Sequence, residues 1–222
     1  MTKPPEAGAP GRRVLVLFAH PAFEKSRINR RLIAQLEGLE GVRLHDLYEE
    51  YPDFDVNVAR EQALLEAHDV LVVHHPFYWY STPALVKQWV DLVLEHGWAY
   101  GGKGRALLGK WWGHALTAGG GAEAYQPGGF NRHTVRGMLA PFEQTARLCA
   151  MRFLPPFVVH GTHRIEAATI EEHARSYRAY LERLRDPAFD LARIAHLDTF
   201  DVDGIDNVEN ADRVGAAPAA RA

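Results

Sequence analysis

The hydrophobic residues of this chain fall into short unbroken stretches that alternate with amphipathic segments. Residues 14–20 (VLVLFAH) and 70–74 are almost wholly apolar, which is typical of strands buried on both faces of a sheet. We expect further strands at residues 111–121, which end in glycines, and at residues 157–162. Apolar and polar positions alternate at residues 42–48, which predicts a more exposed strand.

Segments with helical periodicity lie between these strands. Apolar residues recur at helical spacing from Ser26 to Leu39, with arginines on the opposite side. Thr82 and Pro83 suit the N-cap and first helical positions of a later helix, and Pro141 interrupts another. We expect the helices after the first at residues 61–68, 82–93, 133–150 and 167–184. Five strands that alternate with helices predict right-handed crossovers and a parallel sheet with helices on both faces, a doubly wound α/β domain.

The two ends of the chain lack this periodicity. Residues 1–12 are rich in proline and glycine, and residues 186–222 are acidic and rich in small residues. We therefore expect a flexible leader at residues 1–12, one domain at residues 13–185 and an acidic C-terminal tail at residues 186–222.

Composition and charge narrow the classes of function. The 222 residues are 47% hydrophobic and carry a formal net charge of -3, so a general basic field is absent and we expect no nucleic-acid partner. Cys149 is the only cysteine, which excludes an internal disulfide and a cysteine-based zinc cluster; we expect it to be a buried small residue and expect no metal site. The first residues lack the apolar core of a signal peptide, and no window reaches the length of a membrane span. We expect a cytoplasmic protein, and any membrane contact is expected to be peripheral, at the inner face of the cell membrane.

Ligands of doubly wound sheets bind beyond the carboxyl ends of the strands, where the strand order reverses. The loop after the first strand leads to Ser26, a suitable N-cap, and the exposed backbone N–H groups of the following helix suit an anion. His20, Arg27 and Asn29 add side-chain donors. No G-x-G-x-x-G follows this strand, and a phosphate site and simple helix capping both remain open readings of the loop.

Two further loops carry candidate chemistry. Four consecutive aromatic residues, Phe77 to Tyr80, follow the third strand and either cover the core or offer flat faces to a planar ring. The loop from Thr117 to Tyr125 contains three glycines, whose N–H groups can approach a ligand without obstruction by a Cβ atom. The three loops thus offer, in order along the chain, a phosphate site, a stacking surface and close backbone donors. Together they predict a flavin site.

These motifs also carry a family resemblance. The stretches AHP with SxxN, HHPFYWYSTPALVKQWVD, HGWAYG, TAGGG and FLPPFVVH resemble the flavodoxin-like NAD(P)H:quinone oxidoreductases. The match is strongest to the ancillary subunits of bacterial glutathione-regulated potassium-efflux systems, because it extends to YPDFDVNVAREQALL. The resemblance spans residues 14–180. It implies a flavodoxin-like sheet of order 2-1-3-4-5, bound FMN with FAD as the alternative, NAD(P)H as co-substrate, a quinone or other small electrophile as acceptor, and a homodimer.

The resemblance also implies roles for individual residues. The flavin phosphate end would be bound by His20, Ser26, Arg27, Ile28 and Asn29, and the isoalloxazine ring by Phe77, Tyr78, Trp79, Tyr80, Thr117, Ala118, Gly119 and Gly120. Backbone N–H groups of residues 77–80 and 118–120 are expected to face the ring, and Ala118, which replaces a threonine usual in the family, has only its backbone to offer. Tyr125 lies where the family has an active-site tyrosine, and His133 is the candidate for its companion histidine.

The implied activity is a two-electron hydride transfer from NAD(P)H through flavin N5 to a quinone, in which both substrates use one pocket in turn by a ping-pong mechanism. The alternative is a regulatory ancillary subunit that activates a potassium/proton efflux antiporter. The sequence does not select the physiological quinone or decide between NADH and NADPH.

Three other features favour structural roles. The stretch GRALLGK at residues 104–110 fits part of a P-loop, yet Trp111 follows it and it precedes a strand, so we do not expect nucleotide hydrolysis. His74 and His75 should point to opposite faces of their strand. Trp89 has the helical spacing of a core residue.

Overall fold

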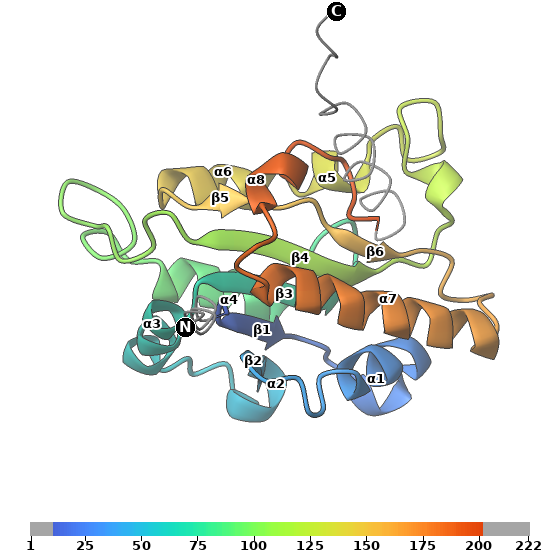
Figure 1. Cartoon of the computed structure of the whole chain (residues 1–222), viewed down its shortest axis with the longest axis horizontal. Coiled ribbons are helices and arrows are strands. Elements are labelled where there is room, and N and C mark those ends of the chain that lie inside the picture. Colours follow the sequence, from blue (N-terminus) through green and yellow to red (C-terminus); the bar gives the residue numbers. More distant parts are fainter. Residues whose placement is uncertain (1–10, 202–222) are drawn as a thin grey trace, which may run out of the picture.

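A computed structural model describes residues 11–201, and the remainder of the expected leader and tail lies outside this range. A parallel sheet forms the middle of the fold (Figure 1). Its strands are β1 (Val14–Phe18), β2 (Val42–Asp46), β3 (Val70–Pro76), β4 (Trp111–Thr117), β5 (Arg152–Phe153) and β6 (Phe157–Val159). They follow the order β2-β1-β3-β4-β5, with β6 also paired to β4, and every pairing is parallel. The predicted doubly wound fold and strand order are confirmed.

The unbroken apolar stretches of the sequence are the central strands. Every residue of β1, β3 and β4 is buried, because helices cover both faces of the sheet there. The edge strand β2 is buried at His45 alone, which explains its alternating pattern.

The fifth position of the sheet holds two short strands where one was expected. Pro155 and Pro156 separate β5 from β6, and a proline has no N–H group to donate to a neighbouring strand. The strand predicted at residues 157–162 begins as expected but ends at Val159, where a loop starts. The pattern did not predict β5, because two residues are too few for a periodicity.

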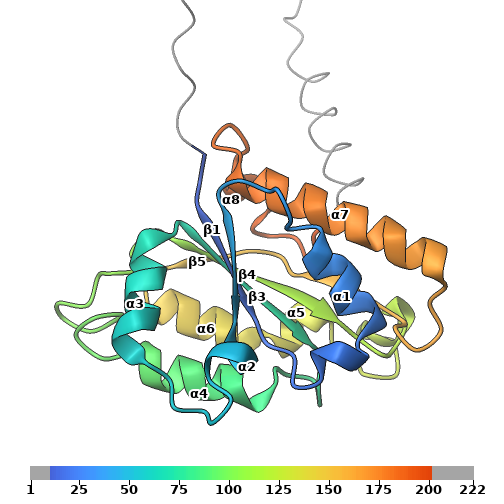
Figure 2. The same ribbon diagram turned by 90° about the horizontal axis from the view of Figure 1, so that it is seen from below.

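Helices pack on both faces of the sheet (Figure 2). One face carries α1 (Arg27–Ala34), α7 (Ala167–Arg185) and α8 (Leu191–Ile194). The other face carries α2 (Leu47–Glu50), α3 (Val58–Ala67), α4 (Ala84–Val93), α5 (Val135–Met138) and α6 (Ala140–Leu148), and two 3-10 turns lie at Phe23–Lys25 and Ala122–Ala124.

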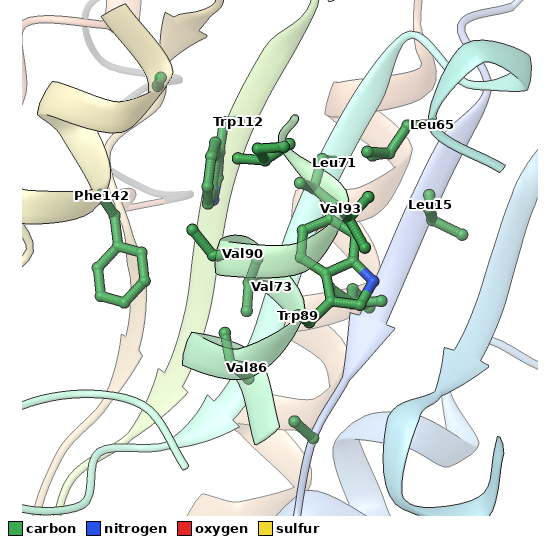
Figure 3. Close-up of a cluster of buried hydrophobic side chains, with 14 of the residues drawn as sticks. Leu15, Leu65, Leu71, Val73, Val86, Trp89, Val90, Val93, Trp112 and Phe142 are labelled. Carbon is green, nitrogen blue, oxygen red and sulfur yellow. The ribbon is translucent and has the colours of Figure 1, made fainter. Parts of the chain in front are cut away.

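Each face of the sheet has its own hydrophobic core. Trp89 of α4 packs among Leu15, Val73 and Leu65 in the core shown in Figure 3, and Trp112 of β4 belongs to the same cluster. Both tryptophans are fully buried, so the prediction that Trp89 is a core residue is confirmed. Cys149 is buried in this core as well, and its burial raises the thiol pKa to about 11.

Some helix boundaries differ from the sequence pattern. The first helix ends at Ala34, although Leu36 and Leu39 still pack on the core from the following turns and so continue the apolar spacing. Pro83 is the N-cap of α4 where it was expected as the first helical residue, and the helix begins at Ala84, because the ψ angle of Pro83 is 152° and not helical. The predicted interruption near Pro141 is present as the break between α5 and α6.

Residues 186–201, which the sequence pattern assigns to the tail, pack against the domain. Phe189, Leu191, Ile194 and Phe200 are buried on the core beneath α7. Arg136 of α5 donates hydrogen bonds to the carbonyl oxygens of residues 195 and 197. The packed chain therefore continues to at least Phe200.

None of the helices within residues 11–201 has the combination of length and apolar character that crossing a bilayer requires.

A buried carboxylate connects β2, α3 and α4. Glu61 is fully buried and accepts hydrogen bonds from His45 Nε2 at 2.8 Å, Tyr51 Oη at 2.5 Å and Trp89 Nε1 at 2.8 Å. Burial alone raises the pKa of Glu61, but the hydrogen bonds from His45, Tyr51 and Trp89 outweigh it and the pKa lies below its usual value. Because its pKa is lower in the folded state, ionised Glu61 stabilises the fold at neutral pH, and this contribution is lost as the pH falls through the folded-state pKa.

We predict that Glu61→Leu lowers the free energy of unfolding by about 3–5 kcal/mol, because three buried donors lose their acceptor. Urea denaturation at pH 7 measures this change. Glu40→Ala, at an exposed position, is the matched control and should change stability by less than about 0.5 kcal/mol. Equal stabilities of the two variants would contradict the structural role of Glu61.

Candidate functional site

A cavity of about 780 Å³ opens at the carboxyl ends of β1, β3 and β4. Its volume is in the range of small-molecule sites. The loops after these three strands all line it, and every predicted cofactor-binding residue lines it except Ala118. Tyr125 lines it as well. The structure therefore brings together the three loops that the sequence singled out.

The first loop ends in a helix N-terminus with unused donors. Ser26 is the N-cap of α1, as predicted, and its Oγ accepts bonds from Asn29 N at 3.1 Å and Asn29 Nδ2 at 3.0 Å. The Ser26 hydroxyl hydrogen is therefore available to a ligand. The N–H groups of Arg27 and Ile28 have no acceptor within the described residues. Such a helix start suits a phosphate or carboxylate group.

A buried chain of hydrogen bonds orients Asn29. Its Oδ1 lies 2.9 Å from His74 Nε2, and His74 Nδ1 lies 2.9 Å from the Tyr177 hydroxyl. Burial lowers the pKa of His74 to about 3, so the ring is neutral: Nε2 donates to Asn29 and Nδ1 accepts from Tyr177. The Asn29 amide group is consequently aimed at Ser26 Oγ and at Thr117 Oγ1, the latter at 3.2 Å. This network fixes the first loop against the third.

His20 lines the cavity, and one of its ring nitrogens is engaged within the protein. Its Nδ1 accepts the backbone N–H of Ala22 at 3.1 Å, and burial lowers the His20 pKa. The neutral ring therefore carries its proton on Nε2, which makes Nε2 a hydrogen-bond donor for a ligand.

The aromatic loop combines core residues with exposed ones. Phe77 is buried and its N–H donates to Thr117 O at 2.8 Å, while the Tyr78 N–H donates to Pro76 O at 3.0 Å. Trp79 is 93% exposed, and Trp79 and Tyr80 have positive φ angles of 48° and 63°. Bulky residues rarely adopt this conformation, and strain of this kind collects at functional sites.

Some of the predicted backbone donors are already engaged by the protein. The N–H groups of Phe77 and Tyr78 are used as described above, and that of Ala118 donates to Val159 O at 2.8 Å. Ala118 is buried and does not line the cavity, because it still continues the pairing of β4 with β6. The expectation that these three N–H groups face a ligand was wrong.

Four other N–H groups remain without a partner. Those of Trp79, Tyr80, Gly119 and Gly120 have no acceptor within residues 11–201. All four residues line the cavity, two in the loop after β3 and two in the loop after β4. The cavity therefore presents two pairs of preorganised backbone donors.

The two candidate catalytic residues line different cavities. The ring of Tyr125 contacts Phe77 and His160, with ring centroids 6.1 and 5.4 Å apart, and burial raises the Tyr125 pKa. His133 lies in a neighbouring cavity, lined also by Tyr80, and is not among the residues that line the main one. Tyr80 borders both cavities, so it separates the two candidates.

The structure adds residues that the sequence reasoning missed. Thr162 and His163 line the cavity from the loop after β6, and Lys25 lines it beside α1. The position of residues 160–163 directly after a parallel strand was the signal that could have found them, since the three predicted loops were chosen by that criterion. The strand predicted at residues 157–162 extended into this loop and so concealed its start.

The histidines of β3 point to opposite faces, as predicted, and His75 Nε2 contacts His114 Nδ1 at 3.0 Å on the face away from Asn29. In the part of the chain that the structure describes, no three His, Cys, Asp or Glu side chains form a group that could hold a metal ion.

Comparisons with known proteins agree with this architecture. A model of the flavodoxin-like fold family matches residues 12–181. The chain is 43% identical over 181 residues to the glutathione-regulated potassium-efflux system ancillary protein KefG of Serratia proteamaculans (strain 568), covering 82% of this chain and 95% of that protein. A similar solved structure is general stress protein 14 of Treponema denticola in complex with FMN, with a TM-score of 0.73 and 39% identity, covering 78% of this chain and 99% of that one. Another is an NADPH-quinone reductase from P. pentosaceus, with a TM-score of 0.69 and 33% identity, covering 76% of this chain and 96% of that one.

We predict that Asn29→Leu lowers the free energy of unfolding by about 1–3 kcal/mol, because the buried His74 Nε2–H loses its acceptor. Thermal and urea denaturation measure the change. Arg30→Ala, at the next and exposed position of α1, is the control and should be close to neutral. A neutral Asn29→Leu would show that the network does not hold the two loops together.

Proposed function

The chain belongs to the flavodoxin-like fold family, and on that basis we propose that it is an FMN-dependent oxidoreductase that reduces quinones or similar small electrophiles with NAD(P)H. The observation that carries the proposal is the set of four unpaired N–H groups, on Trp79, Tyr80, Gly119 and Gly120, around one cavity at the edge of the sheet. The similarity to a protein solved with FMN and to an NADPH-quinone reductase, at 39% and 33% identity, supports it.

The donor set fits FMN. The phosphate would bind at the start of α1, where the Ser26 hydroxyl and the N–H groups of Arg27 and Ile28 are available and Lys25 lines the cavity. The polar edges of the ring would meet the N–H groups of the aromatic and glycine loops. FAD remains the alternative, and the FMN-bound relative favours the smaller cofactor.

The protein's own residues would orient and shield the reacting groups. Bound FMN would supply the hydride chemistry, which no side chain provides. Trp79 and Tyr80 would exclude water from one face of the ring, and the N–H groups of Gly119 and Gly120 would stabilise negative charge at its edge. Tyr125 is protonated at neutral pH, and burial raises its pKa further above the ordinary value, so its hydroxyl can donate a hydrogen bond to the acceptor's oxygen. His133 is its proposed companion across Tyr80.

We propose that NAD(P)H and the acceptor occupy the open side of the cavity in turn, which gives ping-pong kinetics. We also propose a homodimer, because Trp79 and Phe130 are 93% and 89% exposed and lie at the main cavity and its neighbour. A cytoplasmic location, with docking at the inner face of a membrane, completes the proposal.

The purified chain should bind FMN, show the visible absorption of a flavoprotein, and oxidise NAD(P)H only when a quinone is present. Trp79→Ala should weaken FMN binding and slow turnover, each by about tenfold, because one face of the ring loses its cover. Leu148→Ala, at an exposed apolar position on α6, is the control and should change neither. A colourless protein without this activity would reject the proposed function, and an unchanged Trp79→Ala would reject the role of that residue alone.

A second candidate function is favoured by the 43% identity to KefG over 82% of the chain. We propose that the chain also acts as the ancillary subunit of a potassium/proton efflux antiporter and activates it under electrophile stress. The two functions are compatible, since a cofactor site at one edge of the sheet leaves other surfaces for docking.

Co-expression with the antiporter of the same organism tests this second function. The chain should co-purify with the antiporter and increase electrophile-triggered potassium efflux from cells, relative to cells with the antiporter alone. Trp79→Ala should separate the functions if docking does not need the cofactor. Absence of both co-purification and increased efflux would contradict the regulatory role.

A further inference from the structure

A fourth loop, residues 161–165 after β6, closes one side of the candidate site. Thr162 and His163 of this loop line the main cavity together with the three loops discussed above. The loop follows a parallel strand in the same way as the other three.

Hydrogen bonds fasten this loop at both ends. At its start, Gly161 N donates to Gly120 O at 2.9 Å and Thr162 N donates to Ala118 O at 3.2 Å. At its end, Arg27 Nη2 donates to Ile165 O at 3.1 Å. The loop therefore runs from the glycine loop to the first turn of α1, that is, from the proposed ring-binding side of the cavity to its phosphate-binding side.

The imidazole of His163 lies directly over Gly119. A Cβ atom added at Gly119 would be 2.6 Å from His163 Nε2 and 2.9 Å from its Cδ2, so the ring occupies the space that a side chain at residue 119 would fill. Neither ring nitrogen of His163 has a hydrogen-bond or ion-pair partner among residues 11–201. The imidazole is thus a free polar group that packs against Gly119, whose own N–H is unpaired within the described residues.

The surroundings of His163 favour an anion. Lys25 and Arg27 line the same cavity, and the start of α1 contributes the positive end of its dipole. The side chain of Arg27 is held toward the fourth loop by its bond to Ile165 O. The cavity therefore offers an anion donors from both the helix start and the fourth loop.

We propose that His163 binds the phosphate of FMN from the fourth loop, which Arg27 ties to the first turn of α1, and so makes the site selective for FMN over unphosphorylated riboflavin. This inference rests on the proposed function, because it concerns the same cavity.

Fluorescence-quenching titrations with FMN and with riboflavin test the proposal without reference to turnover. His163→Ala should raise the FMN dissociation constant by about tenfold, the loss expected for one charge-assisted hydrogen bond, and leave that of riboflavin within about twofold. His96→Ala, at an exposed histidine outside the cavity, is the matched control and should leave both constants unchanged.

A double-mutant cycle with Gly119→Ala provides the second variant. The new methyl group would displace the imidazole, so Gly119→Ala should also reduce the preference for FMN over riboflavin. In the Gly119→Ala/His163→Ala double variant, the loss of preference should be smaller than the sum of the two single losses, because both substitutions remove the same contact.

Equal losses of FMN and riboflavin affinity in His163→Ala, or no loss of either, would overturn the role of His163 while leaving the flavin site intact. Strictly additive losses in the double variant would also overturn it. A wild-type protein that binds neither compound would overturn this proposal together with the proposed function, so the two failures are distinguishable.

Discussion

The hydrogen bonds of the Asn29 side chain are the interaction on which the candidate site depends. They join α1 to the third loop through Ser26 and Thr117, and they are aimed by His74 and Tyr177 behind them. Because every member is buried or partly buried, a broken link would leave a donor or acceptor without water to replace it. The first and third loops therefore keep a fixed separation, and the cavity between them has a defined shape.

The same arrangement explains why some donors stay unused. The N–H groups of Phe77 and Ala118 form hydrogen bonds to neighbouring strands of the sheet. These bonds fix the first residues of the second and third loops. Further along these loops, Trp79 and Tyr80 have positive φ angles, and Gly119 and Gly120 lie in irregular backbone. The N–H groups of these four residues therefore have no protein acceptor in the described structure. Strain and unpaired donors both lower stability, and both are typical of sites that a ligand completes.

Much of the fold could be predicted from the sequence because the central strands are buried on both faces and therefore unbroken in hydrophobicity. At the fifth position of the sheet only β6 was predicted, because Pro155 and Pro156 separate it from β5, which is too short to show a period. The packing of Phe189 and Phe200 was also missed, because isolated aromatic residues between polar ones show no periodicity even when the fold buries them. In the site, the rule that ligands bind after parallel strands selected three loops that line one cavity. The fourth loop was missed because the predicted strand at residues 157–162 extended into it. The sequence could not predict which individual N–H groups are free, because this depends on the residues at which the pairing between β3, β4 and β6 ends.

The central claim is that the unpaired N–H groups of Trp79, Tyr80, Gly119 and Gly120 form a flavin cradle. A titration of ¹⁵N-labelled protein with FMN, followed by amide proton and nitrogen shifts, tests it most directly. The account predicts saturable shifts at these four amides and at Arg27 and Ile28, with little change at the hydrogen-bonded amides of Leu64 and Leu65 in α3. Shifts concentrated elsewhere, or no shifts at all, would contradict it.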